Sequence, residues 1–160
     1  GDDSLALPMI PVGAEGVMLN HVEKQVTVSA LKDTIQRADE VGLATIVCAD
    51  SMAEAKMIAT LKPNIILCEP SELIGTGVSV GAEYVEAAMH AVKDTDPDIM
   101  VLTAAGIHNG EDVYNTISAG ADATGSSSGI AGIKDTAGRA AMVDEMIGAC
   151  RKAWDERHAK

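Results

Sequence analysis

The chain has 160 residues, of which 47% are apolar and 22% charged, so one domain over residues 1–160 can bury a sizeable core. Its net charge of −12 argues against nucleic acid and anionic membrane as partners, because both need a basic face. A small anionic ligand stays compatible with this charge if backbone N–H groups or a local cation hold it. The sequence has no Phe, one Trp and two Tyr, and such an aliphatic core suits a parallel sheet covered by helices.

Cysteines, histidines and the N-terminus indicate a cytoplasmic protein without a metal. Cys48, Cys68 and Cys150 form no Cys-x-x-Cys pair, and we expect buried free thiols in a reducing compartment. No histidine pair has metal-ligand spacing. No apolar run reaches the length of a membrane span, and the N-terminus lacks the features of a signal peptide. The missing initiator Met indicates processing or a start within a longer protein.

Strand-like and helix-like segments alternate along the chain. In chain order we expect a strand over 16–20, a helix over 28–40, a strand over 43–48, a helix over 51–61, a strand over 64–68, a helix over 81–95, a strand over 99–103, a helix over 109–119, a strand over 121–125 and a helix over 136–158. Thr27 or Ser29 caps the first helix, which ends at Gly42, and Asp50 or Ser51 caps the second.

Five βα units with continuous apolar strands predict an α/β fold with a parallel sheet and right-handed crossovers. Polar and glycine-rich residues follow the strands, whereas the connections from helix to strand are short. Parallel sheets carry their chemistry at the carboxyl ends of their strands, so we expect the functional site there.

The most informative segment is EPSELIGTG at residues 69–77, directly after the third strand. Glu69 stands at a strand end, Pro70 stiffens the next position, and Gly75 and Gly77 close the loop. An acid beside a glycine-hinged loop is what proton abstraction under a moving lid requires. Desolvation there can raise the pKa of Glu69 toward neutrality, so that it accepts a proton from a carbon next to a carbonyl. The alternative is a helix-capping or surface acid.

His21 follows the first strand and is the second candidate for catalysis. An imidazole there can donate a hydrogen bond to a substrate carbonyl and stabilise an enediolate. A lone histidine at a strand end is more often structural, and His108, in the loop after the fourth strand, is the competing candidate.

Two glycine-containing loops are candidates for binding an anion. Gly106 and the pair Ser128-Gly129 can expose backbone N–H groups, and the short segment 130–133 can offer a helix N-terminus to a phosphate. A phosphate site built from the last two βα loops and a short extra helix is typical of eight-fold βα barrels. The alternative is ordinary turn chemistry.

The order Asn-His-x-Glu at 20–23, EPSELIGTG at 69–77, Ala-Gly-Ile at 105–107 and Gly-Ala-Asp…Ser-Gly at 120–129 resembles the triosephosphate isomerase family. The chain is most similar to the archaeal-type branch and to its bacterial sugar-phosphate isomerase paralogues. The likeness runs from about Gly13 to the end, with residues 1–12 poorly matched, and it covers five of the eight βα units of a TIM barrel.

This resemblance implies an aldose–ketose phosphate isomerase that interconverts glyceraldehyde 3-phosphate and dihydroxyacetone phosphate, or close homologues, through an enediol. It implies a glycolytic and gluconeogenic enzyme of the cytoplasm that needs no cofactor. It also implies a homo-oligomer, or association with a missing N-terminal segment.

The resemblance further implies roles for single residues. Glu69 is the base, His21 the neutral imidazole that polarises the carbonyl, and Glu23 the carboxylate behind it. The lid that closes over the phosphodianion comprises Pro70, Ser71, Glu72, Leu73, Ile74, Gly75, Thr76 and Gly77. Within it Gly75 donates its N–H, and the other backbone phosphate contacts come from Gly106, Ser128 and Gly129.

The sequence departs from the family in three places. Val22 replaces a usual serine, and Ser126 and Ser127 stand where the archaeal form is more apolar, which leaves the sugar length open. No residue takes the place of the first-strand Lys that stabilises the anionic substrate, so we expect the chain alone to be slow or inactive. Three explanations of the five units are open: a fragment of a longer protein, a chain that needs a partner, or a rebuilt five-unit sheet. An isolated five-stranded sheet leaves two edge strands exposed, which natural proteins avoid. A non-catalytic sugar-phosphate binding module and a structural fragment are the alternative functions.

Overall fold

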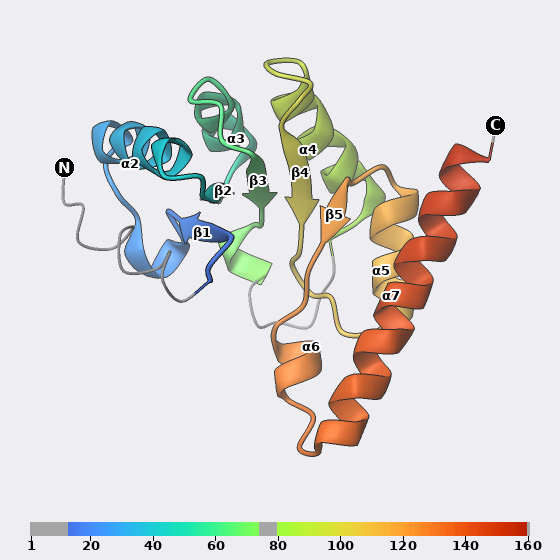
Figure 1. Cartoon of the computed structure of the whole chain (residues 1–160). Coiled ribbons are helices and arrows are strands. Elements are labelled where there is room, and N and C mark those ends of the chain that lie inside the picture. The colour runs from blue at the N-terminus through green and yellow to red at the C-terminus, as the bar shows by residue number, and fades with distance from the viewer. Residues whose placement is uncertain (1–12, 74–79, 160) are drawn as a thin grey trace.

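The structure is a computed structural model that describes residues 13–73 and 80–159, without the side chain of Glu72. Five strands form one parallel sheet in the order β1-β2-β3-β4-β5 (Figure 1). The strands are β1 (Gly16–Leu19), β2 (Ala44–Ala49), β3 (Ile65–Cys68), β4 (Met100–Thr103) and β5 (Ala123–Thr124). Neighbours in the sheet are consecutive in the sequence. Because all five strands run parallel, their carboxyl ends lie at the same end of the sheet, called here the carboxyl edge.

The helices follow the strands as predicted. They are η2 (Val22–Lys24), α2 (Val28–Glu40), α3 (Met52–Ala59), η3 (Ser71–Leu73), α4 (Ala82–Lys93), α5 (Gly110–Ser118), α6 (Ser128–Ala131) and α7 (Thr136–His158). Thr27 and Ser51 are the N-caps of α2 and α3, because their side chains accept hydrogen bonds from Ala30 N and Glu54 N. The expected order of elements and the parallel sheet are therefore confirmed, while the poorly matched residues 1–12 lie outside the described residues.

The fifth strand is shorter than the predicted 121–125. Gly120 has φ of 120°, and the Asp122 carboxylate accepts the Val101 N–H at 2.9 Å. A side chain thus occupies the place that a backbone carbonyl would have in a longer ladder. Lys93 Nζ lies 2.8 Å from the same carboxylate and balances its charge.

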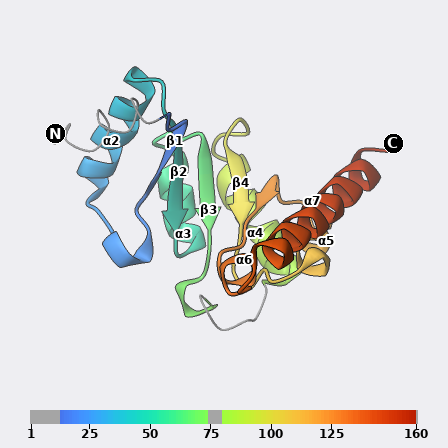
Figure 2. The same ribbon diagram turned by 60° about the horizontal axis from the view of Figure 1, so that its bottom comes forward.

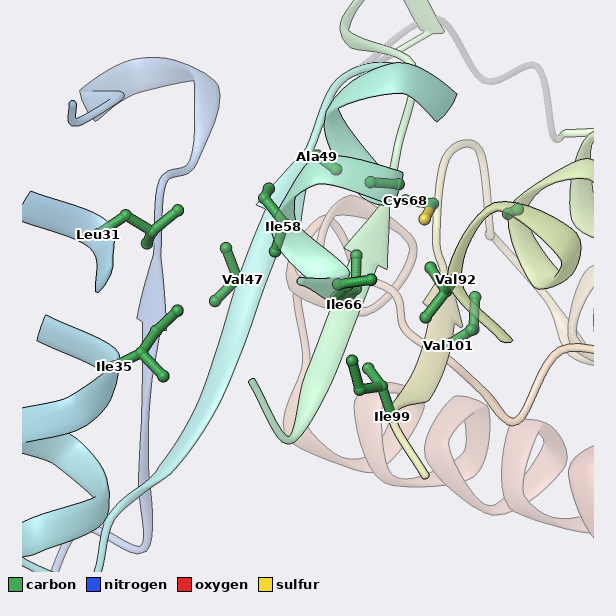
Figure 3. Packing of buried hydrophobic residues seen from close by; sticks show 13 residues of the cluster. Leu31, Ile35, Val47, Ala49, Ile58, Ile66, Cys68, Val92, Ile99 and Val101 are labelled. Carbon is green, nitrogen blue, oxygen red and sulfur yellow. The ribbon is translucent and has the colours of Figure 1, made fainter. Parts of the chain in front are cut away.

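One face of the sheet packs against helices. Leu31 and Ile35 of α2 face Val47 of β2, and Ile58 of α3 packs near Ile66 of β3 (Figure 3). Each of these five side chains is at most 3% exposed. The alternation of a strand sends every second side chain into this layer, which explains why β-branched residues dominate it.

The opposite face of the sheet is open along one row of positions within the described residues, whereas Cys48 and Leu67, in the next row toward the carboxyl edge, are only 4% and 5% exposed. The alternate positions carry Met18, 56% exposed, and Met100, 43% exposed, while Ile46 and Ile65 are half-buried. A parallel sheet is normally covered on both faces, so this apolar face is one that a complete fold would bury.

The long helix α7 lies along α5 and closes one end of the molecule (Figures 1 and 2). Glu145 of α7 accepts the Gly110 N–H at the start of α5, at 2.8 Å. At the other end, Arg157 Nη1 donates to the carbonyls of Ile117 and Ala121 at 2.8 and 2.9 Å. The two ends of α5 are thus satisfied by side chains of α7. Among the described helices, none combines the length and the hydropathy that crossing a bilayer requires.

We expect Arg157→Met to destabilise the fold by about 2 kcal/mol, because it leaves the Ile117 carbonyl at the end of α5 and the Ala121 carbonyl before β5 without a charged donor. Guanidinium unfolding monitored by circular dichroism measures the change. Arg151→Met on the same helix, at an exposed position, is the matched control and should change little. Equal stability of the two variants would contradict the proposed clamp.

Candidate active site at the carboxyl edge

The turn after β1 is fixed by Asn20. This residue has φ of 61°, a left-handed conformation that asparagine tolerates better than most residues. It is 7% exposed, its Nδ2 donates to Cys48 O at 3.1 Å and to Glu54 Oε1 at 2.9 Å, and its Oδ1 accepts the Val26 N–H at 3.1 Å. All polar atoms of the side chain are therefore engaged, and the next residue, His21, leaves β1 in a defined direction.

His21 caps η2 and directs its second nitrogen away from that cap. Its Nδ1 faces the Glu23 N–H at 3.5 Å, a long contact, and Glu23 Oε2 lies 3.7 Å from the same atom. When Nδ1 of a neutral imidazole accepts, Nε2 carries the proton and can donate it to a ligand. The Glu23 side chain itself is 87% exposed, so this carboxylate stands at the surface beside the ring.

Glu69 directly follows β3, and its backbone is held in the sheet. Its N–H donates to Ala49 O at 3.1 Å, which extends the β2–β3 ladder by one residue. Because Cys68 points into the helix-covered layer, the next side chain, that of Glu69, lies on the opposite side of the sheet. Burial raises the pKa of Glu69, the nearby imidazole of His21 lowers it, and the Asp50 carboxylate raises it further, with a net upward shift.

The structure places Glu69 and His21 at the same carboxyl edge, at the ends of β3 and β1 with β2 between them, although 48 positions separate them in the sequence. His108, the competing histidine, is half-buried in the loop after β4, where its backbone N–H donates to Asp112 Oδ2 at 2.9 Å. An acid that holds its proton more tightly than usual beside an imidazole N–H can take a proton from carbon while the ring polarises a neighbouring carbonyl. No group of three metal-ligating side chains occurs among residues 13–73 and 80–159.

The glycine loops on the β4–β5 side are packed together. Gly106 has φ of 73°. A Cβ on Gly129 would lie 2.7 Å from Ser126 Oγ and 2.8 Å from His108 Cα, so only glycine fits at the start of α6. Ser126 Oγ also donates to Ile107 O at 2.6 Å. Gly106 and the Ser128-Gly129 pair, predicted to bind an anion, thus belong to two loops in direct contact.

Part of the predicted lid lies outside the described residues. Ile74, Gly75, Thr76 and Gly77 belong to that part, and so does the side chain of Glu72. Pro70, Ser71 and Leu73 are described: η3 begins at Ser71, and the Leu73 N–H donates to Pro70 O at 2.9 Å. These roles therefore stay predictions.

Sequence reasoning assigned no role in the site to four residues that build it, although Asp50 was considered as a helix cap. Besides Asn20 they are Gln25, Asp50 and Glu54. The Ser51-x-x-Glu54 spacing is a capping-box signal, and Glu54 uses its second oxygen to accept the Asp50 N–H at 2.9 Å. Nothing in the sequence indicates the bond between Gln25 and Asp50, because it joins two different loops.

The cysteines do not take part in this chemistry. All three are free thiols, Cys48 and Cys68 buried and Cys150 half-buried. Burial, with a smaller effect of nearby Glu69, raises the pKa of Cys48 to about 11, and burial raises that of Cys68 to about 12. Both stay protonated at neutral pH and are poor nucleophiles.

Fold and site define a class before any comparison: a βα-barrel-type protein with an acid and an imidazole at the carboxyl edge. Comparison with known families narrows this class. Residues 6–136 match the family model described as triosephosphate isomerase. A triosephosphate isomerase of Methanocaldococcus jannaschii is 38% identical over 126 residues, which are 77% of this chain and 58% of that protein. One of Sulfolobus acidocaldarius is 34% identical over 147 residues, 91% of this chain and 63% of that protein. The chain belongs to the triosephosphate isomerase family.

The chain spans about 52–63% of the length of the curated relatives it matches. Solved structures agree with a partial TIM-barrel-like fold. The match with a designed cube-shaped protein cage has a TM-score of 0.73 at 19% sequence identity, and it covers 99% of this chain and 53% of the cage chain. The match with a thiamine phosphate pyrophosphorylase from Pyrococcus furiosus has a TM-score of 0.66 at 19% sequence identity, and it covers 91% of this chain and 63% of that protein's chain. At this identity the likeness shows the fold alone.

The raised pKa of Glu69 predicts how its replacement changes stability with pH. A folded chain that binds this proton more tightly than the unfolded chain loses stability as pH rises through the folded pKa. We therefore expect the stability of Glu69→Gln, relative to wild type, to increase between about pH 4 and pH 7. Thermal melts across this range measure it.

Glu40→Gln is the matched control with the opposite sign. A hydrogen bond from Arg37 lowers the pKa of Glu40, so that carboxylate contributes stability at neutral pH that is lost as pH falls through its folded pKa. Its replacement should therefore become less stable, relative to wild type, as pH rises through the folded pKa toward the ordinary glutamate value of about 4.3, so the melts for this pair extend below pH 4. The same sign in both variants would refute the assignment for Glu69.

Proposed function

We propose that the chain carries the base and the electrophile of a triosephosphate isomerase-type reaction on a small phosphorylated sugar. The observation that supports this most is the placement of Glu69 and His21 at the same carboxyl edge, at the ends of β3 and β1, with the pKa of Glu69 raised by burial. Glyceraldehyde 3-phosphate and dihydroxyacetone phosphate are the substrates we propose first, in a cytoplasmic, glycolytic or gluconeogenic setting and in a homo-oligomer.

In the proposed reaction, the Glu69 carboxylate removes a proton from the carbon next to the carbonyl. Negative charge develops on the carbonyl oxygen, and the Nε2–H of His21 hydrogen-bonds to it and transfers its proton there, which gives the enediol. The same nitrogen then takes the hydroxyl proton from the neighbouring oxygen, which becomes the new carbonyl oxygen. Protonated Glu69 then returns its proton to the neighbouring carbon. One hydrogen moves between two carbons and one between two oxygens of the same molecule, so the proposed reaction needs no cofactor.

The β4–β5 side is proposed to hold the phosphate. Gly106, Ser128 and Gly129 lie in the two loops that pack against each other there. Neither residues 104–109 nor residues 125–129 contain an acid, so backbone N–H groups there face no competing carboxylate from their own loops. Gly75 is proposed to add its N–H from the lid.

We further propose that the isolated chain is impaired, and that further βα units must complete the site. The open sheet face with Met18 and Met100 supports this. So does an apolar cavity beside the edge strand β5, lined by Thr124, Ile130, Met146 and other side chains of α6 and α7. A preceding segment of a longer chain fits both surfaces, because it can pair with the edge strand β5 and cover the sheet face that carries Met18 and Met100. The same segment would supply the missing cation.

Deuterium exchange tests the proposed base. Dihydroxyacetone phosphate incubated with the chain in D2O should gain deuterium next to its carbonyl, and Glu69→Gln should slow this about 10²- to 10⁴-fold. Mass spectrometry of the sugar phosphate follows the exchange. Glu86→Gln, an exposed acid on α4, is the control and should keep the wild-type rate. Equal rates in wild type and Glu69→Gln, both above the rate without protein, reject catalysis by Glu69.

A second test concerns the phosphate side and separates catalysis from mere binding. A phosphoglycolate-type analogue should raise the melting temperature of the wild type but not that of Gly129→Ala, because the new methyl group displaces the loop after β4. Gly148→Ala meets nothing within 4 Å and is the control that should still respond. A melting shift without deuterium exchange would favour a non-catalytic binding module, whereas a normal shift in Gly129→Ala would exclude this phosphate position.

A further inference from the structure

Asp50 stands beside Glu69 because of the strand register. Ala49 of β2 pairs with Cys68 of β3, and continuing this register by one residue sets Asp50 opposite Glu69. Neighbouring strands are about 4.8 Å apart, and residues of one row share a face of the sheet. The two carboxylates are therefore placed next to each other at the carboxyl edge. The sheet order β1-β2-β3 also puts Asp50 between His21 and Glu69.

Two contacts hold Asp50 in this position. Its Oδ2 accepts a hydrogen bond from Gln25 Nε2 at 2.9 Å, and its backbone N–H donates to Glu54 Oε2 at 2.9 Å. Glu54 is itself tied to Asn20, whose backbone leads into His21. The acid is thus linked on one side to α3 and on the other to the loop that carries the imidazole.

We propose that Asp50 is a positioning residue of this site: a fixed negative charge that Gln25 holds beside Glu69 and that strengthens Glu69 as a base. This inference rests on the proposed function, since it assigns a task to a neighbour of the proposed base. Asp50 transfers no proton in this scheme. It acts because a second negative charge nearby disfavours ionisation of Glu69, so that the ionised form binds a proton more readily.

The groups around Glu69 agree with this assignment. Burial is the main reason that its pKa is raised, His21 acts in the opposite direction, and Asp50 adds to the rise. On the β2 side the Cys48 thiol also faces Glu69, with Asp50 and Glu54 near it. On the β4 side, residues 104–106 carry no ionisable side chain. Among the described groups that act on Glu69, Asp50 is therefore the carboxylate that moves it toward a stronger base.

The titration of Glu69 in the ligand-free chain tests the proposal. Carbon-detected NMR of labelled side-chain carboxyl groups follows Glu69 in wild type, Asp50→Asn, Asp50→Glu and Gln25→Leu. We expect Asp50→Asn to lower its midpoint by about half a pH unit, and this difference should shrink in about 1 M salt. Asp50→Glu should stay nearer the wild type, because it keeps the charge. Gln25→Leu should give a smaller downward shift than Asp50→Asn, because the Asp50 charge is kept and only its hydrogen bond from Gln25 is lost.

Asp33→Asn, an exposed acid on α2, is the control for a general change in net charge and should leave the midpoint in place. A midpoint unchanged in Asp50→Asn overturns the proposal, and so does an equal shift in Asp33→Asn. The measurement needs no turnover, so it fails independently of the proposed function. If the midpoint shifts as expected while Glu69→Gln leaves deuterium exchange intact, the pairing of Asp50 with Glu69 stands and the role of Glu69 as base falls.

Discussion

The parallel register of β1, β2 and β3 is the constraint on which the site depends. Each strand is hydrogen-bonded to its sequence neighbours, so residues far apart in the chain leave the sheet at the same edge. The Glu69 N–H to Ala49 O bond is the last rung of this ladder. A slip of one residue would turn the Glu69 side chain from the open side of the sheet into the apolar layer beneath the helices. Packing and chemistry are therefore specified by the same alternation.

That alternation also explains the unequal faces of the sheet. One set of strand positions meets α2, α3 and α4 and is fully buried, while the other set includes the exposed Met18 and Met100. The open face is as apolar as a core, so its composition fits a surface that other segments cover. Glu69 and Asp50 lie on this same side. Segments that cover this face would also exclude water from the proposed base, which links completion of the fold to the base strength proposed for Glu69.

Much of this arrangement could be predicted from the sequence, and the exceptions have physical reasons. Apolar strands and helix caps such as Thr27 and Ser51 are local signals, and they gave the right order of elements. The length of β5 was wrong, because the Asp122 carboxylate replaces a backbone acceptor, and that substitution depends on a contact with β4. Glu69 and His21 could be named as candidates because each follows a strand. The supporting bonds of Asn20, Gln25, Asp50 and Glu54 were not, because each joins segments that only the folded sheet brings together.

The charges along the carboxyl edge give the proposed site a direction. Glu23, Asp50, Glu54 and Glu69 lie on the β1–β3 side, whereas residues 104–109 and 125–129 on the β4–β5 side contain no acid. An anionic group is repelled from the first side, and the second offers backbone N–H groups without a competing carboxylate in the same loops. A sugar phosphate would therefore lie with its phosphate toward β4 and β5 and its carbonyl end toward His21 and Glu69. The acids of this acidic protein are thus segregated from the place proposed for the anion.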